Sequence, residues 1–171
     1  MLQVYTGDGK GKTTSACGLA IRAIGQGMRV CYIHFHKDPE KYGYGEIMVL
    51  EKLGVDIYGF AKKHPYFDKD VKNKEIRNEC LSGLEFVKKL YQENKYDVLI
   101  LDEIIVSLRD GFIKEAEFLE ILEKKPENLE LVLTGRDFPE NLIENVDLVS
   151  EIKNIKHPFD KGIKGRKGIE F

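Results

Sequence analysis

The sequence predicts a single three-layer α/β domain, in which helices cover both faces of a mostly parallel sheet of about five or six strands. First, apolar strand-like runs alternate with helix-like patterns along the chain, which favours parallel strands joined by right-handed helical crossovers. Second, one run, VLIL at residues 98–101, is apolar throughout, as expected for a central strand covered on both faces. Third, 171 residues, 42% of them hydrophobic, suffice for one folded core.

The first half of the chain supplies three of the predicted strands. Residues 2–5 form a short apolar run that glycines stop, and residues 13–26 predict a helix that Gly25 and Gly27 end. Residues 29–35 (RVCYIHF) and 55–60 (VDIYGF) are rich in β-branched and aromatic side chains and predict the next two strands. Between them, residues 36–45 are polar and hold one proline and two glycines, so we expect a loop there.

The second half continues the alternation. A long helix is expected at residues 69–94, a strand at 97–101, a helix at 113–124 that stops before Pro126, and a strand at 129–134. A short helix at 139–145 and a final strand at 148–152 follow. We therefore expect one domain over residues 1–171, in which residues 157–171 form a C-terminal tail that packs near the active site.

Composition excludes several classes of function. The 27 basic and 29 acidic residues give a net charge of −2, so we expect no general nucleic-acid binding. No apolar run approaches the length of a membrane span, and the N-terminal MLQVYTGDGKGK has no charged leader before an apolar core, so we expect neither a membrane segment nor a signal peptide. Three cysteines without CxxC spacing predict reduced thiols in a cytoplasmic protein.

The strongest local motif is TGDGKGKTT at residues 6–14, between the first strand and the first helix. Gly11, Lys12 and Thr13 match the end of the phosphate-loop pattern GxxxxGK[ST], whereas the pattern's first glycine falls on Thr6. Glycines let backbone N–H groups point inward, and the following helix N-terminus favours an anion. The residues that we expect to bind nucleotide here are Gly7, Asp8, Gly9, Lys10, Gly11, Lys12, Thr13 and Thr14.

Two further strand ends complete the predicted site. Asp102 and Glu103 follow an apolar strand, so with Thr13 they predict a site for Mg²⁺, with Mn²⁺ as the alternative ion. Arg136 follows another strand at the same predicted edge and is a candidate triphosphate clamp, with a plain surface arginine as the alternative. Together these motifs predict a P-loop NTPase-like, RecA-like fold.

The motifs alone leave the reaction open. A kinase would need an acceptor site, and a GTPase would normally carry an NKxD motif, which NKEI at residues 73–76 does not match. A small ATPase in which Glu103 positions the hydrolytic water is one hypothesis, and a nucleotide-dependent binding module without catalysis is another.

The order of motifs resembles one family. YTGDGKGKTT at residues 5–14, VLILDE at 98–103, LTGR at 133–136 and KHPFDKG at 156–162 occur in the order seen in the P-loop corrinoid adenosyltransferases, the ATP:cob(I)alamin family. The closing GRKGIEF at residues 165–171 also resembles that family's C-terminus, and HPFDKG with KGIEF is the most specific part. The resemblance covers nearly the whole chain.

The resemblance implies a reaction and its partners. ATP binds with magnesium beside a corrinoid substrate, the Co(I) centre attacks the ribose 5′-carbon, and triphosphate leaves. Because cobalt is the nucleophile, no protein base is needed; the implied catalytic residues are Lys12, Thr13, Glu103 and Arg136. It also implies a reversed triphosphate orientation relative to kinases, a flavoprotein reductant and a homodimer.

The sequence departs from the family pattern at two places, one in the phosphate loop and one at the aromatic pair that contacts the corrin. Asp8 stands where relatives have Asn, so we expect it to point away from the phosphates or to face the metal. A family Phe-x-Trp pair, which presses on the lower face of the corrin and displaces the axial ligand of cobalt, is replaced by His64 and Tyr66, with Phe67 adjacent. We therefore expect these three residues to bind the corrinoid, with loop packing as the alternative.

Two histidines flank Phe35 at the end of the second predicted strand. We expect His34 and His36 to be polar residues at a loop edge, with a metal-binding pair on one strand face as the alternative.

Overall fold

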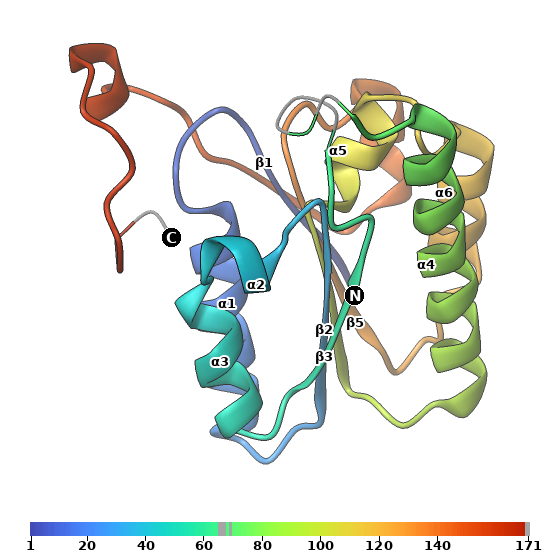
Figure 1. Cartoon of the computed structure of the whole chain (residues 1–171). Coiled ribbons are helices and arrows are strands. Elements are labelled where there is room, and N and C mark those ends of the chain that lie inside the picture. The colour runs from blue at the N-terminus through green and yellow to red at the C-terminus, as the bar shows by residue number, and fades with distance from the viewer. Residues whose placement is uncertain (65–67, 69, 170–171) are drawn as a thin grey trace.

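The computed structural model describes residues 1–64, 68 and 70–169 (Figure 1). Its strands form one sheet in the order β3-β2-β4-β5-β1-β6, and every neighbouring pair is parallel. This confirms the predicted parallel sheet. The strand bounds are β1 Leu2–Thr6, β2 Val30–Phe35, β3 Asp56–Phe60, β4 Val98–Asp102, β5 Glu130–Thr134 and β6 Leu148–Glu151.

Helices cover both faces of this sheet, which gives the three predicted layers. In Figure 1, α1, α2 and α3 lie on one side of the sheet, and α4, α5 and α6 lie on the other. The helix bounds are α1 Lys12–Ile24, α2 Pro39–Tyr42, α3 Gly45–Lys52, α4 Asn73–Glu93, α5 Ile104–Arg109 and α6 Glu115–Glu123. Two short 3₁₀ helices follow, η1 Glu140–Asn145 and η2 Pro158–Lys161.

Each face of the sheet has its own hydrophobic core. Strand β4 is buried along its whole length: Leu99 and Leu101 belong to the larger core beneath α4, α5 and α6, whereas Val98 and Ile100 belong to the core beneath α1. The prediction of a central strand covered on both faces is thus confirmed. Helix α1 approaches the sheet through small side chains, because Ala16, Ala20 and Ala23 form its buried side.

The parallel register aligns the strand ends at one edge. His34 of β2 pairs with Asp102 of β4, and Tyr5 of β1 pairs with Thr134 of β5. The loops that follow β1, β2, β4 and β5 therefore leave the sheet side by side. This edge is where open α/β sheets bind ligands.

The expected loop at residues 36–45 is wrong in part, since a short helix begins inside it. Asp38 caps α2 by accepting a hydrogen bond from the Lys41 amide, Pro39 occupies the first turn, and Gly43 ends the helix with a φ of 65°. Helices α3 and α5 were also not expected. They are too short, at 8 and 6 residues, for helical periodicity to stand out in the sequence.

His34 is not the expected loop-edge residue, because β2 buries it fully. Gly59 of β3 pairs with His34 in the register, and a Cβ on Gly59 would clash with the His34 ring. The His36 backbone turns to a φ of 55°, and its ring Nε2 lies 2.7 Å from the Ser107 hydroxyl. The two histidines thus have separate environments, which do not support a shared metal pair.

Burial should make stability depend on the protonation of His34. Burial and the nearby Lys37 ammonium lower the pKa of His34 to about 4. Between about pH 6.5 and 4, His34 is therefore protonated in the unfolded chain but neutral in the folded chain. The free energy of unfolding should fall by up to roughly 3 kcal/mol as the pH decreases through this window. Urea unfolding between pH 7 and 5 measures the slope. His34→Gln should reduce this slope but not abolish it, because burial also lowers the pKa of His36 to about 4. Equal slopes in both proteins would contradict the assignment.

Candidate functional site

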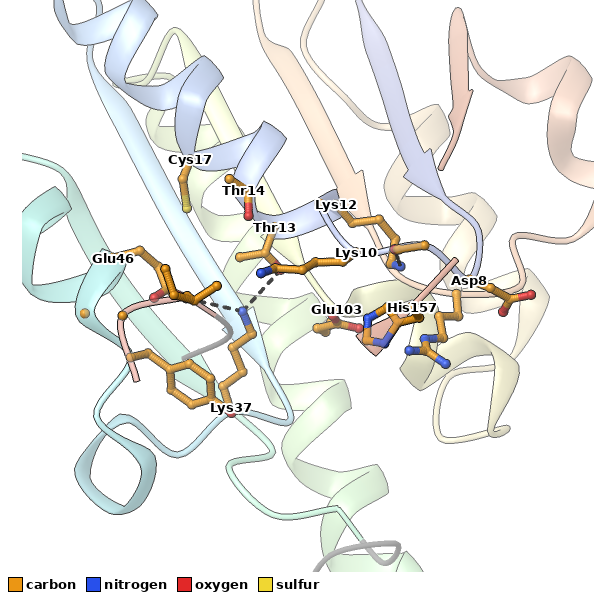
Figure 2. A pocket seen from close by; sticks show the side chains of 17 residues that line it. Asp8, Lys10, Lys12, Thr13, Thr14, Cys17, Lys37, Glu46, Glu103 and His157 are labelled. Carbon is orange, nitrogen blue, oxygen red and sulfur yellow. Dashed lines mark hydrogen bonds and ion pairs between the residues drawn. The ribbon is translucent and has the colours of Figure 1, made fainter. Parts of the chain in front are cut away.

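A cleft of about 640 Å³ lies at the carboxyl edge of the sheet (Figure 2). The loop after β1 and the start of α1 form one wall, and the segment from Lys37 to Glu46 forms another. The residues predicted to bind nucleotide that line this cleft are Asp8, Gly9, Lys10, Gly11, Lys12, Thr13, Thr14 and Arg136. The structure therefore brings the two predicted parts of the nucleotide site together, and only Gly7 of that set is absent from the cleft wall.

The glycines of the loop are needed for its shape and its packing. Gly7 and Gly11 have φ values of 98° and 130°, which side chains with a Cβ rarely adopt. Gly9 donates its amide to the Ile152 carbonyl at 2.7 Å, and a Cβ on Gly9 would lie 2.7 Å from the carbonyl oxygens of Ile152 and Lys153. The loop is thus held directly against the segment that follows β6.

Gly9→Ala should lower both stability and nucleotide affinity, because the added methyl group forces the loop away from two backbone carbonyls. We expect a loss of about 1–3 kcal/mol in the free energy of unfolding and weaker ATP binding by titration calorimetry. Gly18→Ala is the matched control, since a Cβ at Gly18 in α1 meets nothing within 4 Å. It should raise stability by about 0.5–1 kcal/mol. Equal effects at the two sites would contradict the close packing.

The Lys12 ammonium lies within the phosphate loop. Its Nζ donates to the carbonyl oxygens of Gly7 at 2.6 Å and Gly9 at 2.9 Å. Burial lowers the pKa of Lys12, while the Glu103 carboxylate opposes that shift. A cation held at the centre of the loop is suited to bind phosphate oxygens.

Asp102 is the centre of a buried hydrogen-bond network. Its Oδ1 accepts from Thr13 Oγ1 at 3.0 Å and from Thr134 Oγ1 at 2.7 Å. Its Oδ2 accepts from the Tyr32 hydroxyl at 2.7 Å and forms an ion pair with Lys37 Nζ at 2.5 Å. Burial acts to raise the pKa of Asp102, but Lys37 and the hydrogen bonds hold it below its ordinary value. The carboxylate is therefore ionised at neutral pH.

Lys37, Tyr32 and Thr134 were not predicted as site residues. Lys37 lines the cleft from the loop after β2, and in Figure 2 dashed lines join its ammonium to Thr13 and Glu46. The position of Lys37, two residues after a predicted strand, was the available signal, since polar residues after parallel strands gather at one edge. Tyr32 gave no such signal, because its hydroxyl reaches Asp102 from within a strand.

Glu103 directs its carboxylate toward the cleft from a strained backbone. Its φ and ψ are 62° and 15°, a left-handed conformation that non-glycine residues rarely adopt, and its amide donates to Thr134 Oγ1 at 3.0 Å. Burial and the neighbouring Asp102 raise the pKa of Glu103. The strain at this cleft residue is typical of a functional position.

The oxygen atoms of Thr13, Asp102 and Glu103 are the ligand type that Mg²⁺ prefers. Within the described residues, however, no group of three or more His, Cys, Asp or Glu side chains could hold a metal ion. The residues therefore fit an ion that a nucleotide helps to bind, since Mg²⁺ commonly keeps water and phosphate ligands beside one or two protein groups.

Arg136 is exposed and lines the same cleft from the loop after β5, the strand that pairs with β1. It follows Gly135, whose φ is 145° and whose added Cβ would lie 2.7 Å from Ile105 Cβ. This close approach fixes where the loop after β5 leaves the sheet. Asp8 also lines the cleft, and its charge acts on the Lys12 ammonium.

The three residues expected to bind a corrinoid are only partly described. His64 does not line the cleft; its Nε2 lies 2.7 Å from Asp110 Oδ2, and its ring meets the His36 ring edge-on at 5.0 Å. Tyr66 and Phe67 lie outside the described residues. At the other end of the chain, His157, Gly168 and Ile169 line the cleft.

Comparison with known proteins gives one consistent result. The sequence matches, over residues 1–171, the family described as ATP:corrinoid adenosyltransferase BtuR/CobO/CobP. A corrinoid adenosyltransferase of Sinorhizobium sp is 36% identical over 174 residues, which cover 100% of this chain and 80% of the relative. The corrinoid adenosyltransferase of Escherichia coli (strain K12) is 32% identical over 169 residues, covering 98% of this chain and 84% of the relative.

Proposed function

We infer the function from one premise: the chain belongs to the ATP:corrinoid adenosyltransferase family BtuR/CobO/CobP. The protein is a corrinoid adenosyltransferase, which transfers the 5′-deoxyadenosyl group of ATP to the Co(I) centre of a corrinoid and releases triphosphate. The family match over residues 1–171 carries this conclusion. The alternative of a small ATPase is not favoured.

The adenosyl transfer requires that the protein position ATP and the corrinoid and stabilise the charge on the leaving group. It does not require a protein base. Cobalt supplies the electron pair of the new carbon–cobalt bond, and the bond between the ribose 5′-carbon and oxygen breaks, so negative charge develops on triphosphate. We propose that Lys12, the phosphate-loop amides and Arg136 stabilise this leaving group, because all of them line or enclose the same cleft.

We propose that Mg²⁺ binds with the triphosphate at Thr13 and Glu103, where it would neutralise part of the phosphate charge. Asp102 is assigned a supporting role, since Thr13 Oγ1 donates to it at 3.0 Å. The buried Asp102 network then keeps the Thr13 hydroxyl in place. Glu103, whose left-handed backbone presents it to the cleft, contributes the second oxygen ligand.

An anaerobic reaction tests the function. The protein is mixed with chemically reduced cob(I)alamin, MgATP and buffer, and the corrin absorption spectrum is followed. We expect the Co(I) bands to be replaced by those of a light-sensitive alkylcorrinoid only when both ATP and protein are present. A spectrum that stays that of Co(I) in the complete mixture would contradict the proposed reaction.

We propose that the protein works in the cytoplasm with a reductase partner. All three cysteines are free and buried, which supports a reducing compartment, the cytoplasm. A flavoprotein reductant that delivers the electron to Co(II), and a homodimer, are proposed from the family resemblance. No described helix combines the length and apolar character that crossing a membrane requires.

We propose that Tyr66 and Phe67 press on the lower face of the corrin, in place of the family's aromatic pair. Alanine at both positions should slow adenosylation that starts from Co(II) and a reductant more than adenosylation of prereduced Co(I), because Co(I) has no lower ligand to displace. Parallel rate measurements from the two cobalt states check this. Equal losses would assign both residues to general corrinoid binding, and no loss to loop packing.

A further inference from the structure

The Lys37 ammonium stands where a cation bound to Thr13 and Asp102 would stand. Lys37 Nζ lies 2.5 Å from Asp102 Oδ2 and 3.3 Å from Thr13 Oγ1. Its side chain is only 9% exposed, and that of Asp102 is fully buried. A second carboxylate also faces this ammonium, since Glu46 Oε1 lies 3.8 Å from Lys37 Nζ.

The Asp102 carboxylate has no lone pair to spare for a metal ion while Lys37 stays in place. Each of its oxygens already takes part in two contacts, from Thr13 and Thr134 on Oδ1 and from Tyr32 and Lys37 on Oδ2. A free divalent cation would have to displace the ammonium and would meet its positive charge at close range. Repulsion between like charges a few ångströms apart in a buried site is strong.

We propose that Lys37 is the resident cation beside Asp102 and Thr13: it keeps free divalent ions off these two residues, so that Mg²⁺ binds at Thr13 and Glu103 only together with the nucleotide. The inference rests on the proposed function only in taking this cleft as the nucleotide site. It assigns Lys37 a positioning role, since the residue acts through Asp102 and Thr13.

The surroundings let Lys37 remain in the site when the nucleotide arrives. The ammonium lies 5.1 Å from the centre of the Tyr44 ring and 3.8 Å from Glu46, and all three residues line the cleft. A small shift toward Glu46 would exchange one carboxylate partner for another. The negative charge of the triphosphate then offsets the repulsion that a metal ion alone would meet.

Mn²⁺ titration of the nucleotide-free protein, followed by the electron paramagnetic resonance signal of free Mn²⁺, tests the proposal. Wild type should bind Mn²⁺ only weakly at this site. Lys37→Met and Lys37→Gln should each bind one Mn²⁺ about tenfold or more tightly, because a nearby positive charge is removed. Lys37→Gln keeps a donor to Asp102, so it guards against a folding failure of Lys37→Met.

Two controls assign the gained ion to this position. Lys41→Met removes a positive charge from the exposed α2 surface nearby and should behave as wild type. Adding Asp102→Asn to Lys37→Gln should abolish the gained Mn²⁺ site.

Two results would overturn the proposal. One is wild-type protein that binds Mn²⁺ as tightly as both Lys37 variants, and the other is a gained site that survives Asp102→Asn. The adenosylation assay is run on the same wild-type preparation. An inactive wild type would count against the proposed function, and the Mn²⁺ result would still decide the role of Lys37.

Discussion

Replacing Asp102 with alanine should lower the free energy of unfolding by about 3–5 kcal/mol, because the change leaves the Lys37 ammonium buried without its partner. The hydroxyls of Tyr32 and Thr134 lose their acceptor in the same step. Urea unfolding of the wild type and variant, monitored by circular dichroism, measures the difference. The variant should stay folded only if the free energy of unfolding of the wild type exceeds this loss.

A double-mutant cycle separates the ion pair from the rest of the network. Lys37→Met combined with Asp102→Asn should cost less than the sum of the two single changes, because the double variant leaves no uncompensated charge. Glu85→Ala is the control, since Glu85 is exposed and its ion pair with Lys88 should be worth less than about 1 kcal/mol. If Asp102→Ala lowered the free energy of unfolding by no more than Glu85→Ala does, the buried ion pair would be contradicted.

Replacing Lys12 with alanine should slow adenosyl transfer by about 100-fold, which corresponds to roughly 3 kcal/mol of lost transition-state stabilisation. The Lys12 ammonium is held within the phosphate loop by the Gly7 and Gly9 carbonyls, so the contact proposed with the leaving triphosphate needs no movement of the loop. Single-turnover rates with prereduced Co(I), together with the dissociation constant of MgATP, measure the effect on chemistry and on binding.

Lys12→Arg is the matched comparison for this variant. Arginine keeps the positive charge but replaces the compact ammonium with a planar guanidinium, which cannot occupy the same position. The rate of Lys12→Arg should therefore lie between those of Lys12→Ala and the wild type. Circular dichroism and melting temperature show whether the loop change disturbs the fold. Unchanged turnover in Lys12→Ala would mean that the triphosphate lies elsewhere in the protein.

The elements whose pattern is local could be predicted from the sequence. Consecutive apolar residues predict strand β4, and the glycines before Gly11-Lys12-Thr13 predict the phosphate loop. Both lie where expected. Thr13 donates a hydrogen bond to Asp102, and Thr13 and Glu103 line the same cleft at the carboxyl edge. Helix α3 was missed because it buries only Ile47 and Leu50, too few residues to show a period.

The Asp102 network could not be predicted, because its members are brought together only by the sheet register. Tyr32 and Lys37 come from β2 and its following loop, and Thr134 comes from β5. Likewise, His34 is buried by the glycine opposite it in β3, which no feature of its own strand reveals. Pairings between residues about 25 to 70 positions apart are set by tertiary structure.

The central claim is that the carbon of ATP, and not its phosphate, is transferred. Carbon-13 placed at the ribose 5′-position of ATP tests it directly, when the anaerobic reaction with cob(I)alamin is followed by carbon and phosphorus NMR. We expect the labelled carbon to appear bound to cobalt in the corrinoid while the phosphorus signals become those of intact triphosphate. Labelled ADP with inorganic phosphate, and no label on the corrinoid, would contradict the account.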